Sequence, residues 1–207
     1  MRIAVLAASG RTGSATVRHA LAAGHDVVSV VRTPSKAPAG TTVAQADARD
    51  AAALAHAFRD ADAVVSCVGH VAGQEDPTLL RDSASALVAA MAAVGTRRVV
   101  AVSAAAAYVA GDDPLSRFIA KPILERMLKA NNVDTRAMED VIRSSTAHWT
   151  LLRPSRLVAG NGSARYRSRV DRAVWWHYNT RFDTVGRAAV DALSRSDWIG
   201  HSAFITE

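Results

Sequence analysis

The chain has 207 residues, of which 49% are hydrophobic and 21% are charged. These values are close to the average for globular proteins, and they exclude a wholly disordered chain, a collagen and a disulfide scaffold. The length suits one compact domain that spans residues 1–207. The formal net charge of +6 points to an anionic partner without identifying it.

Cysteine usage and the apolar runs give an expectation for the cellular compartment. The single cysteine, Cys67, cannot form a disulfide within the chain, which is typical of a reducing compartment. The first apolar run, residues 3–8, is too short for the core of a signal peptide, and the sequence has no run of 18 apolar residues. We therefore expect a cytoplasmic protein without a membrane segment. Closely spaced His or Cys pairs are also missing, so we expect no metal site.

Short apolar runs alternate with helical spacing along the chain. Most of these runs have the length and composition of buried strands, and a short, less apolar strand is expected near residues 42–45. The expected strands lie at residues 3–6, 26–31, 42–45, 63–68, 98–103, 150–152 and 203–206. Helical spacing starts at Gly13 and recurs at residues 51–58, 84–94, 114–129 and 185–193. Alternating residues at Tyr166, Ser168 and Val170 predict a further strand at a sheet edge. The whole pattern predicts an α/β fold: a Rossmann-like, doubly wound parallel sheet with flanking helices and a small C-terminal segment on the substrate side.

A glycine-containing turn joins the first expected strand to the first expected helix. Residues 7–13 read A-A-S-G-R-T-G, which fits G-x-x-G-x-x-G except that Ala7 stands at the first glycine position. In a dinucleotide-binding fold, such a turn brings the backbone N–H groups at the helix start close to a pyrophosphate. A turn that is merely tight is the alternative. We predict that the cofactor phosphates contact Ser9, Gly10, Arg11, Thr12 and Gly13.

The end of the second expected strand bears on the choice between NAD and NADP. An NAD-selective protein places Asp or Glu here to bind the ribose 2′-hydroxyl. This chain has Arg32, Ser35 and Lys36 instead, and two cations with a hydroxyl suit a 2′-phosphate. We therefore predict that Arg32 and Ser35 bind NADP and that NADPH is preferred over NADH. Solvated loop charges are the alternative.

Several segments of the chain resemble one family. The turn A-x-S-G-x-T-G, the strand end V-V-R-T-P-S-K and the S-x-x-x-W-T-x-x-R-P segment of residues 145–154 resemble the atypical short-chain dehydrogenase/reductases of the NAD(P)H-binding, NmrA-like type. This type includes the flavin and biliverdin-IXβ reductases, and the similarity covers nearly the whole chain. The resemblance implies an adenine side at Asp47 and Ala48, a ribose side at Val68 and Gly69, and a nicotinamide end at Ser103, Arg153, Pro154, Ser155 and Arg156.

Ser103 and Tyr108 are the candidate catalytic residues. Ser103 ends a core strand, where open α/β sheets hold ligands, and its hydroxyl could bond a substrate carbonyl or the nicotinamide amide. A serine bonded to its own backbone is the alternative. Asp112 stands where the Y-x-x-x-K relay of ordinary short-chain dehydrogenases has its lysine. Without that lysine, Tyr108 is expected to be a poor proton donor, and a packed aromatic residue is an equal alternative.

These features predict an NADPH-dependent oxidoreductase that transfers hydride to a small conjugated or aromatic acceptor, such as a flavin, a quinone or a secondary-metabolite carbonyl. The protein would position the two reactants and solvent would supply the proton. The alternative is a non-catalytic NADP(H)-binding redox sensor, as among some NmrA-like proteins. We expect a monomer or homodimer. Nucleic-acid binding is disfavoured because charge is the only feature that points to it.

The net charge is concentrated in the last third of the chain. Residues 153–187 contain eight arginines and two aspartates, whereas the charges of the remaining residues cancel. We interpret this surplus as the wall of the substrate pocket or of an interface, which favours an anionic or polyphenolic substrate. A solvated arginine-rich surface is the alternative. The aromatic run of residues 175–178 predicts a platform for a flat substrate or for a second subunit, or else a strand that buries one tryptophan.

Overall fold

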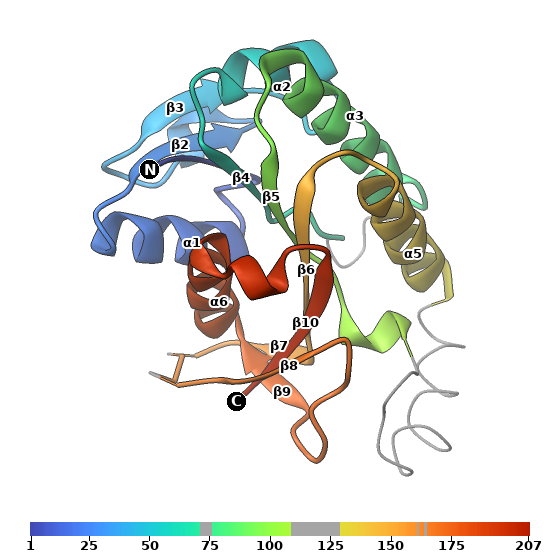
Figure 1. Cartoon of the computed structure of the whole chain (residues 1–207). Helices are drawn as coiled ribbons and strands as arrows, with labels where there is room; N and C mark the ends of the chain where they lie inside the picture. Colours follow the sequence, from blue (N-terminus) through green and yellow to red (C-terminus); the bar gives the residue numbers. More distant parts are fainter. Residues whose placement is uncertain (71–75, 109–128, 161, 164) are drawn as a thin grey trace.

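The computed structural model describes residues 1–70, 76–108, 129–160, 162–163 and 165–207. Its main feature is an eight-stranded sheet in the order β3-β2-β1-β4-β5-β6-β10-β8 (Figure 1). The strands are β1 (Arg2–Leu6), β2 (Asp26–Val31), β3 (Thr42–Gln45), β4 (Ala63–Ser66), β5 (Arg98–Val102), β6 (His148–Pro154), β8 (Arg167–Val170) and β10 (His201–Thr206). All neighbours pair in parallel except β8, which runs antiparallel to β10. The order of the six strands from β3 to β6 is that of Rossmann sheets, so the predicted fold class is confirmed.

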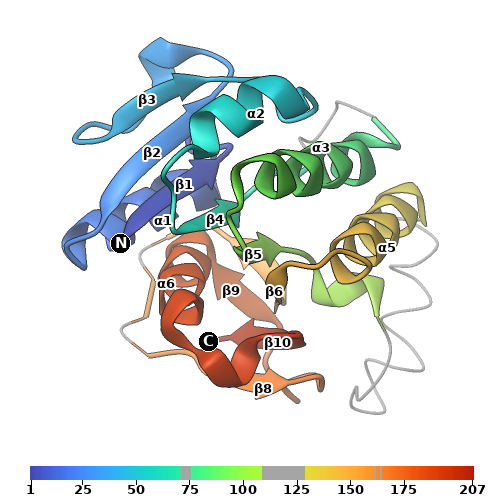
Figure 2. The same ribbon diagram turned by 45° about the horizontal axis from the view of Figure 1, so that its top comes forward.

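Helices cover both faces of this sheet, as Figure 2 shows from above. One face carries α1 (Arg11–Ala22) and α6 (Phe182–Ser194), which pack against each other. The other face carries α2 (Ala51–Phe58), α3 (Leu79–Val94) and α5 (Lys129–Arg143). None of these helices is long and apolar enough to cross a membrane, among the residues described.

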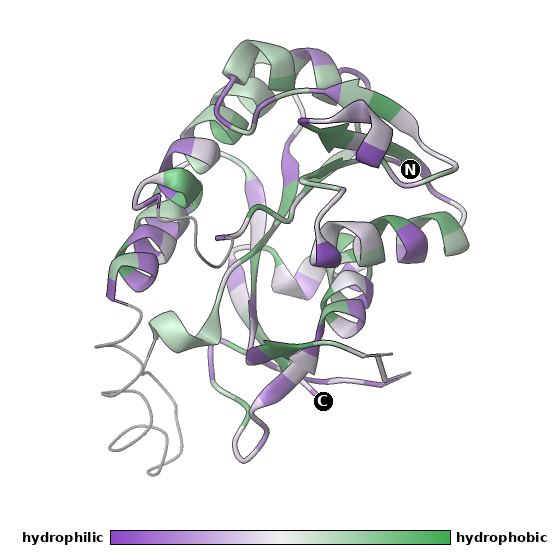
Figure 3. Cartoon of the chain, turned by 180° about the vertical axis from the view of Figure 1, so that it is seen from behind, coloured by the Kyte–Doolittle hydropathy of each residue, from purple (hydrophilic) through white to green (hydrophobic). Residues whose placement is uncertain are grey.

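The two apolar cores follow from the alternation of side chains along each strand. On β2, Val28 and Val30 belong to the core on the α2 side of the sheet, whereas Val27 and Val31 belong to the core on the α1 side. Each core strand is therefore apolar on both faces, which is why it reads as a continuous apolar run. Figure 3 shows the central strands mainly in green, with purple concentrated on the helices and outer loops.

The C-terminal segment adds a small second sheet beside the main one. It consists of β7 (Arg156–Val158) and β9 (Asn179–Arg181), which pair in parallel. The edge strand predicted around residues 166–170 is confirmed as β8, the outermost strand of the main sheet. The exposed residues Trp175 and Trp176 lie between β8 and β9, not in a strand, so the alternative of a strand that buries one of them is wrong.

Two helices differ from the sequence-based expectation. Helix α3 begins at Leu79 and not at Ala84, because a carboxylate from α5 caps its first turn, and local periodicity does not show such a cap. Helix α5 was not predicted, because its buried face carries polar residues that include Asp134 and Glu139. The helix expected at residues 114–129 lies outside the described residues except for its last one.

The remaining differences concern the ends of elements. Strands β4 and β5 end at Ser66 and Val102, shortly before the expected ends. Strand β6 is longer than residues 150–152 and reaches Pro154, which pairs with Ile205 of β10.

Candidate functional site

The predicted site residues converge on one edge of the sheet. Because β1 to β6 run parallel, their carboxyl ends meet at the same edge, where open α/β sheets bind ligands. The positions follow the strands in turn: residues 9–13 after β1, Arg32 and Ser35 after β2, Asp47 and Ala48 after β3, Val68 and Gly69 after β4, Ser103 and Tyr108 after β5, and residues 153–156 at the end of β6. The fold therefore brings together six segments that are far apart in the sequence.

The turn after β1 has the conformation of a glycine turn in spite of its alanine. Ala7 has a φ of 60°, in the left-handed region that favours glycine. At Gly13 an added Cβ would lie 2.2 Å from the Ala7 carbonyl oxygen, so only glycine allows helix α1 to approach the strand this closely. The turn thus keeps the backbone conformation of glycine at Ala7 and the close contact of helix and strand at Gly13.

The start of α1 is open to an anion. Gly10 is its N-cap and supplies no side-chain hydrogen bond, and the first turn contains no acidic residue. By contrast, the Asp50 carboxylate caps α2 by accepting hydrogen bonds from the N–H groups of Ala52 and Ala53. The N–H groups and partial positive charge at the start of α1 are therefore available to a phosphate.

The segment after β2 presents a cation and a hydroxyl at the surface. Arg32 and Ser35 are both exposed, and Ser35 lies in a short 3-10 turn, Pro34–Lys36. None of the described carboxylates forms an ion pair with Arg32, whose carbonyl oxygen accepts a hydrogen bond from Gln45. The Arg32 guanidinium is therefore free of a competing acidic partner among the described residues.

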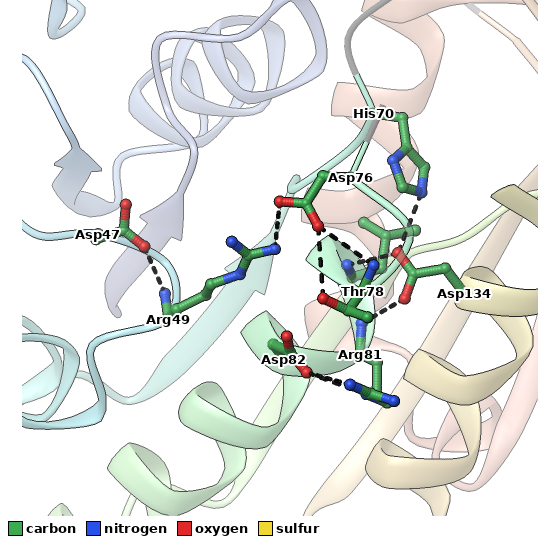
Figure 4. Close-up of polar contacts among 9 residues, drawn as sticks. Asp47, Arg49, His70, Asp76, Thr78, Arg81, Asp82 and Asp134 are labelled. Carbon is green, nitrogen blue, oxygen red and sulfur yellow. Dashed lines mark hydrogen bonds and ion pairs between the residues drawn. The ribbon is translucent and has the colours of Figure 1, made fainter. Parts of the chain in front are cut away.

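The loop after β3 is tied to the segment that precedes α3 (Figure 4). Asp47 Oδ1 accepts a hydrogen bond from the N–H of Arg49 at 2.9 Å, and the Arg49 guanidinium lies 2.5 Å from Asp76 Oδ2. The hydrogen bond from Arg49 is the main reason that the pKa of Asp76 is lowered. These contacts fix the loop on which the predicted adenine-side residues Asp47 and Ala48 lie.

The segment after β4 is anchored next to an open backbone position. His70 Nε2 lies 3.2 Å from Oδ2 of the buried Asp134, which also accepts hydrogen bonds from the N–H groups of Leu80 and Arg81 (Figure 4). An added Cβ at Gly69 would meet no atom of the described residues within 4 Å. Gly69 therefore leaves open space at the predicted ribose side.

The buried Glu139 of α5 joins the two candidate catalytic residues. Its Oε1 accepts hydrogen bonds from Ser103 Oγ at 2.5 Å and from Arg153 Nε at 3.0 Å. Its Oε2 accepts from Arg153 at 2.5 Å and from Arg143 at 3.1 Å. The Glu139 side chain is fully buried, and among the described residues these donors compensate its charge.

Tyr108 lies on the same network. A short 3-10 turn, Ala105–Ala107, leads to it from β5, and the Ala107 carbonyl accepts a hydrogen bond from Arg136 of α5. The Arg153 guanidinium carbon lies 3.4 Å from the centre of the Tyr108 ring. Burial, followed by the charge of Glu139 and a hydrogen bond to it, raises the pKa of Tyr108. This agrees with the expectation of a poor proton donor at neutral pH.

Residues 153–156 are largely engaged by the protein itself. The buried Arg153 bonds Glu139, and Ser155 Oγ lies 2.7 Å from Thr180 Oγ1. Pro154 is buried in β6, and the exposed Arg156 donates to Asn179 Oδ1 at 3.0 Å. Their assignment to the nicotinamide end stays a prediction.

Glu139 is the site residue that sequence reasoning missed. Its charge suggested a surface position, and it lies on a helix that apolar periodicity does not reveal. The one sequence pattern that could have indicated it is the Glu–Arg pair at spacing i, i+4, since Arg143 follows Glu139 by one helical turn.

The sequence of this chain is similar to a protein family and to several known proteins. The model of the NAD(P)H-binding family matches residues 7–196. The chain belongs to this NAD(P)H-binding family. An uncharacterized protein of Mycobacterium tuberculosis is 39% identical over 104 residues, which are 50% of this chain and 12% of that protein. The chain thus spans only about 12% of the length of the curated relatives it matches.

Solved structures with the same fold cover the whole chain. A Burkholderia pseudomallei protein, provisionally described as exported, has a TM-score of 0.85, 25% identity and full coverage of both chains. A Veillonella parvula short-chain dehydrogenase/reductase in complex with NADP has a TM-score of 0.82 and 18% identity, covering 100% of this chain and 94% of its own. The anaerobilin reductase ChuY of Escherichia coli O157:H7 has a TM-score of 0.78 and 19% identity, covering 100% and 97%. These likenesses show that the chain has the fold of these Rossmann-type structures.

Proposed function

We propose that this protein is an NADPH-dependent reductase that transfers hydride to a small conjugated or aromatic acceptor, such as a flavin, a quinone or a carbonyl compound. The observation that carries the proposal is the meeting, at one sheet edge, of a helix start without a side-chain cap, the exposed Arg32, which has no carboxylate partner among the described residues, and the Ser103–Tyr108 pair. Membership of the NAD(P)H-binding family and the structural likeness to a reductase and to an NADP complex support it.

The residues at this edge fit a dinucleotide phosphate. The N–H groups after Gly10 suit the pyrophosphate, and the Arg32 guanidinium with the Ser35 hydroxyl suits the 2′-phosphate. The open space at Gly69 leaves room for a ribose beside the chain. When bound, the dinucleotide supplies the hydride.

The protein's own residues would then position the acceptor without protonating it. The Ser103 hydroxyl donates a hydrogen bond to Glu139, and the pKa of Tyr108 is raised by burial and by that carboxylate. A phenol with a raised pKa is a weak acid at neutral pH, so solvent is the proton source. This suits an acceptor that is reduced by direct hydride transfer.

A non-catalytic NADP(H) sensor is the second candidate function. The same contacts favour it, since they leave neither hydroxyl proton free for chemistry. We further propose that residues 1–207 act as one NAD(P)-binding unit, as a monomer or homodimer, in the cytoplasm.

The first experiment measures the dissociation constants of NADPH and NADH by calorimetry. The protein should prefer NADPH by tenfold or more, and Arg32→Ala should abolish most of that preference, because a charge-assisted hydrogen bond to the 2′-phosphate contributes about 1.5–3 kcal/mol. Arg59→Ala is the matched control, since Arg59 is also exposed but follows α2. An unchanged preference in Arg32→Ala would remove Arg32 from the site.

Two further measurements complete this test. Gly69→Ala should fold normally, because its added Cβ meets no atom of the described residues within 4 Å. It should bind NADPH more weakly, because that Cβ occupies space we assign to the ribose. Oxidation of NADPH is then followed with a flavin, a quinone and a ketone. Tight binding without oxidation of NADPH by any acceptor would favour the sensor over the reductase.

A further inference from the structure

The buried carboxylate of Glu139 controls which hydrogen-bonding role is left to the two candidate catalytic hydroxyls. Glu139 is paired with two guanidinium groups, Arg153 and Arg143, at 2.5 and 3.1 Å. An ionised carboxylate only accepts hydrogen bonds. Ser103 therefore donates its one hydroxyl proton to Glu139 Oε1, at 2.5 Å, and the Tyr108 ring packs on Arg153, the main cation partner of this carboxylate.

A hydroxyl group that donates its proton in one hydrogen bond can still accept another hydrogen bond through its oxygen lone pairs. Ser103 and Tyr108 are only partly buried, and they follow β5 at the ligand-binding edge. Their oxygen lone pairs are thus the groups left for a ligand. A ligand N–H or O–H meets a partner there, whereas a ligand carbonyl meets another acceptor.

The geometry is held from several elements. Glu139 lies on α5, Ser103 follows β5, and Arg153 is on β6, where its guanidinium is packed between the rings of Tyr108 and Phe204 at 3.4 and 5.2 Å from their centres. The N–H of Ser103 is bonded to the Leu152 carbonyl at 2.7 Å. The Ser103 hydroxyl is therefore fixed at both its backbone and its side chain.

We propose that Glu139 is a positioning residue that turns Ser103 and Tyr108 into hydrogen-bond acceptors, so that the site selects a ligand with an amide-type or imide-type N–H. This rests on the proposed function for the location of the ligand. The N–H has two possible sources, the carboxamide of the nicotinamide and a ring N–H of the acceptor. Both have the same chemistry, and they are separated by two pairs of probes.

The experiment compares dissociation constants within each probe pair. NADP⁺ is compared with its 3-acetylpyridine analogue, which replaces the amide NH₂ by a methyl group, and lumiflavin is compared with 3-methyllumiflavin, which lacks the ring N–H. The wild-type protein should bind the N–H member about tenfold more tightly in at least one pair, the value of one net hydrogen bond. Calorimetry and quenching of flavin fluorescence measure binding without any need for turnover.

The variants test whether Glu139 acts through Ser103. Ser103→Ala should reduce the ratio of the two dissociation constants to about one, and Ser103→Thr, which keeps a hydroxyl, should retain it. Glu139→Met combined with Arg153→Met removes the acceptor oxygens of the carboxylate together with its main cation, which avoids an unpaired buried charge. This double variant should reduce the ratio of the two dissociation constants to about one, as Ser103→Ala does. Loss of structure alone would weaken both members of a pair equally and leave the ratio unchanged.

The outcomes separate this inference from the proposed function. Equal binding within both pairs in the wild type, or a ratio that survives in the double variant, overturns the role of Glu139. The ratio of dissociation constants could change in the variants as expected although no acceptor oxidises NADPH. That result would support the positioning role of Glu139 and overturn the proposal that the protein is a reductase. Thermal unfolding of each variant, measured alongside, shows whether the protein compared is folded.

Discussion

At the scale of single residues, Ala7 shows how a backbone position can keep its conformation while losing its usual side chain. The sequence motif marks this position as a glycine, and the structure has a φ of 60° there. A left-handed conformation costs an ordinary L-residue about 1–2 kcal/mol. Glycine avoids this strain, but ordering it on folding costs more conformational entropy, which offsets part of the advantage. The turn therefore contains strain that a glycine would relieve.

We expect Ala7→Gly to stabilise the protein by about 0.5–1 kcal/mol, measured by urea unfolding. Ala8→Gly is the matched control, because Ala8 is fully buried and its φ is not positive, so the same substitution there should destabilise. Destabilisation by Ala7→Gly would show that the left-handed conformation of this turn is not strained.

The candidate site was predictable from sequence where a residue follows a strand. Gly10 and Gly13, Arg32 and Ser103 are marked by their place after apolar runs, and parallel pairing alone then brings them to one edge. Glu139 was not predictable in this way, because its role depends on Ser103 and Arg153, which lie on other elements. Such a relation is set by packing and leaves no local pattern.

At the scale of elements, the apolar runs predicted the core strands well because both faces of each strand are buried. The helices were predicted less well where tertiary contacts decide their limits. The start of α3 at Leu79 depends on Asp134, a buried residue of α5 that caps it from outside the local sequence. The amphipathic pattern of a helix cannot predict a cap that another helix supplies.

We expect Asp134→Ala to destabilise the protein by about 2–4 kcal/mol, because two N–H groups at the start of α3 then lose a buried charged acceptor. Asp50→Ala is the matched control. Asp50 caps α2 with the same number of backbone hydrogen bonds but is exposed, so its loss should cost about 1 kcal/mol. If the urea midpoint of unfolding falls equally in the two variants, burial does not make the Asp134 cap more stabilising than the Asp50 cap.

At the scale of the whole molecule, the arginine surplus of residues 153–187 is distributed among separate places. Arg153 is buried against Glu139, and Arg181 forms an ion pair with Glu207. Arg167 and Arg169 are exposed on β8, three strands away from β5 in the sheet order. The sequence count located the surplus correctly, but only the pairing of strands shows that most of it does not line one surface.

The position of β8 favours the alternative of a solvated surface over a substrate-pocket wall. Strands are about 4.8 Å apart, so β8 lies roughly 14 Å from the strand that ends at Ser103. As an edge strand it exposes unpaired backbone groups, and charged side chains on such a strand hinder edge-to-edge pairing between molecules. Arg167 and Arg169, with Arg165 just before them, suit this role.

We therefore expect the combined replacement of Arg165, Arg167 and Arg169 by Gln to leave the KM for the acceptor and the affinity for NADPH within about twofold. The variant should instead self-associate more as its concentration rises, because it loses three of the six net positive charges, all at or next to an open sheet edge. Light scattering over a concentration series measures this, and replacing Arg2, Arg59 and Arg97 by Gln is the control of equal charge away from that edge. A raised KM without self-association would return these arginines to the substrate pocket, because an edge-strand role does not change the binding of a small acceptor.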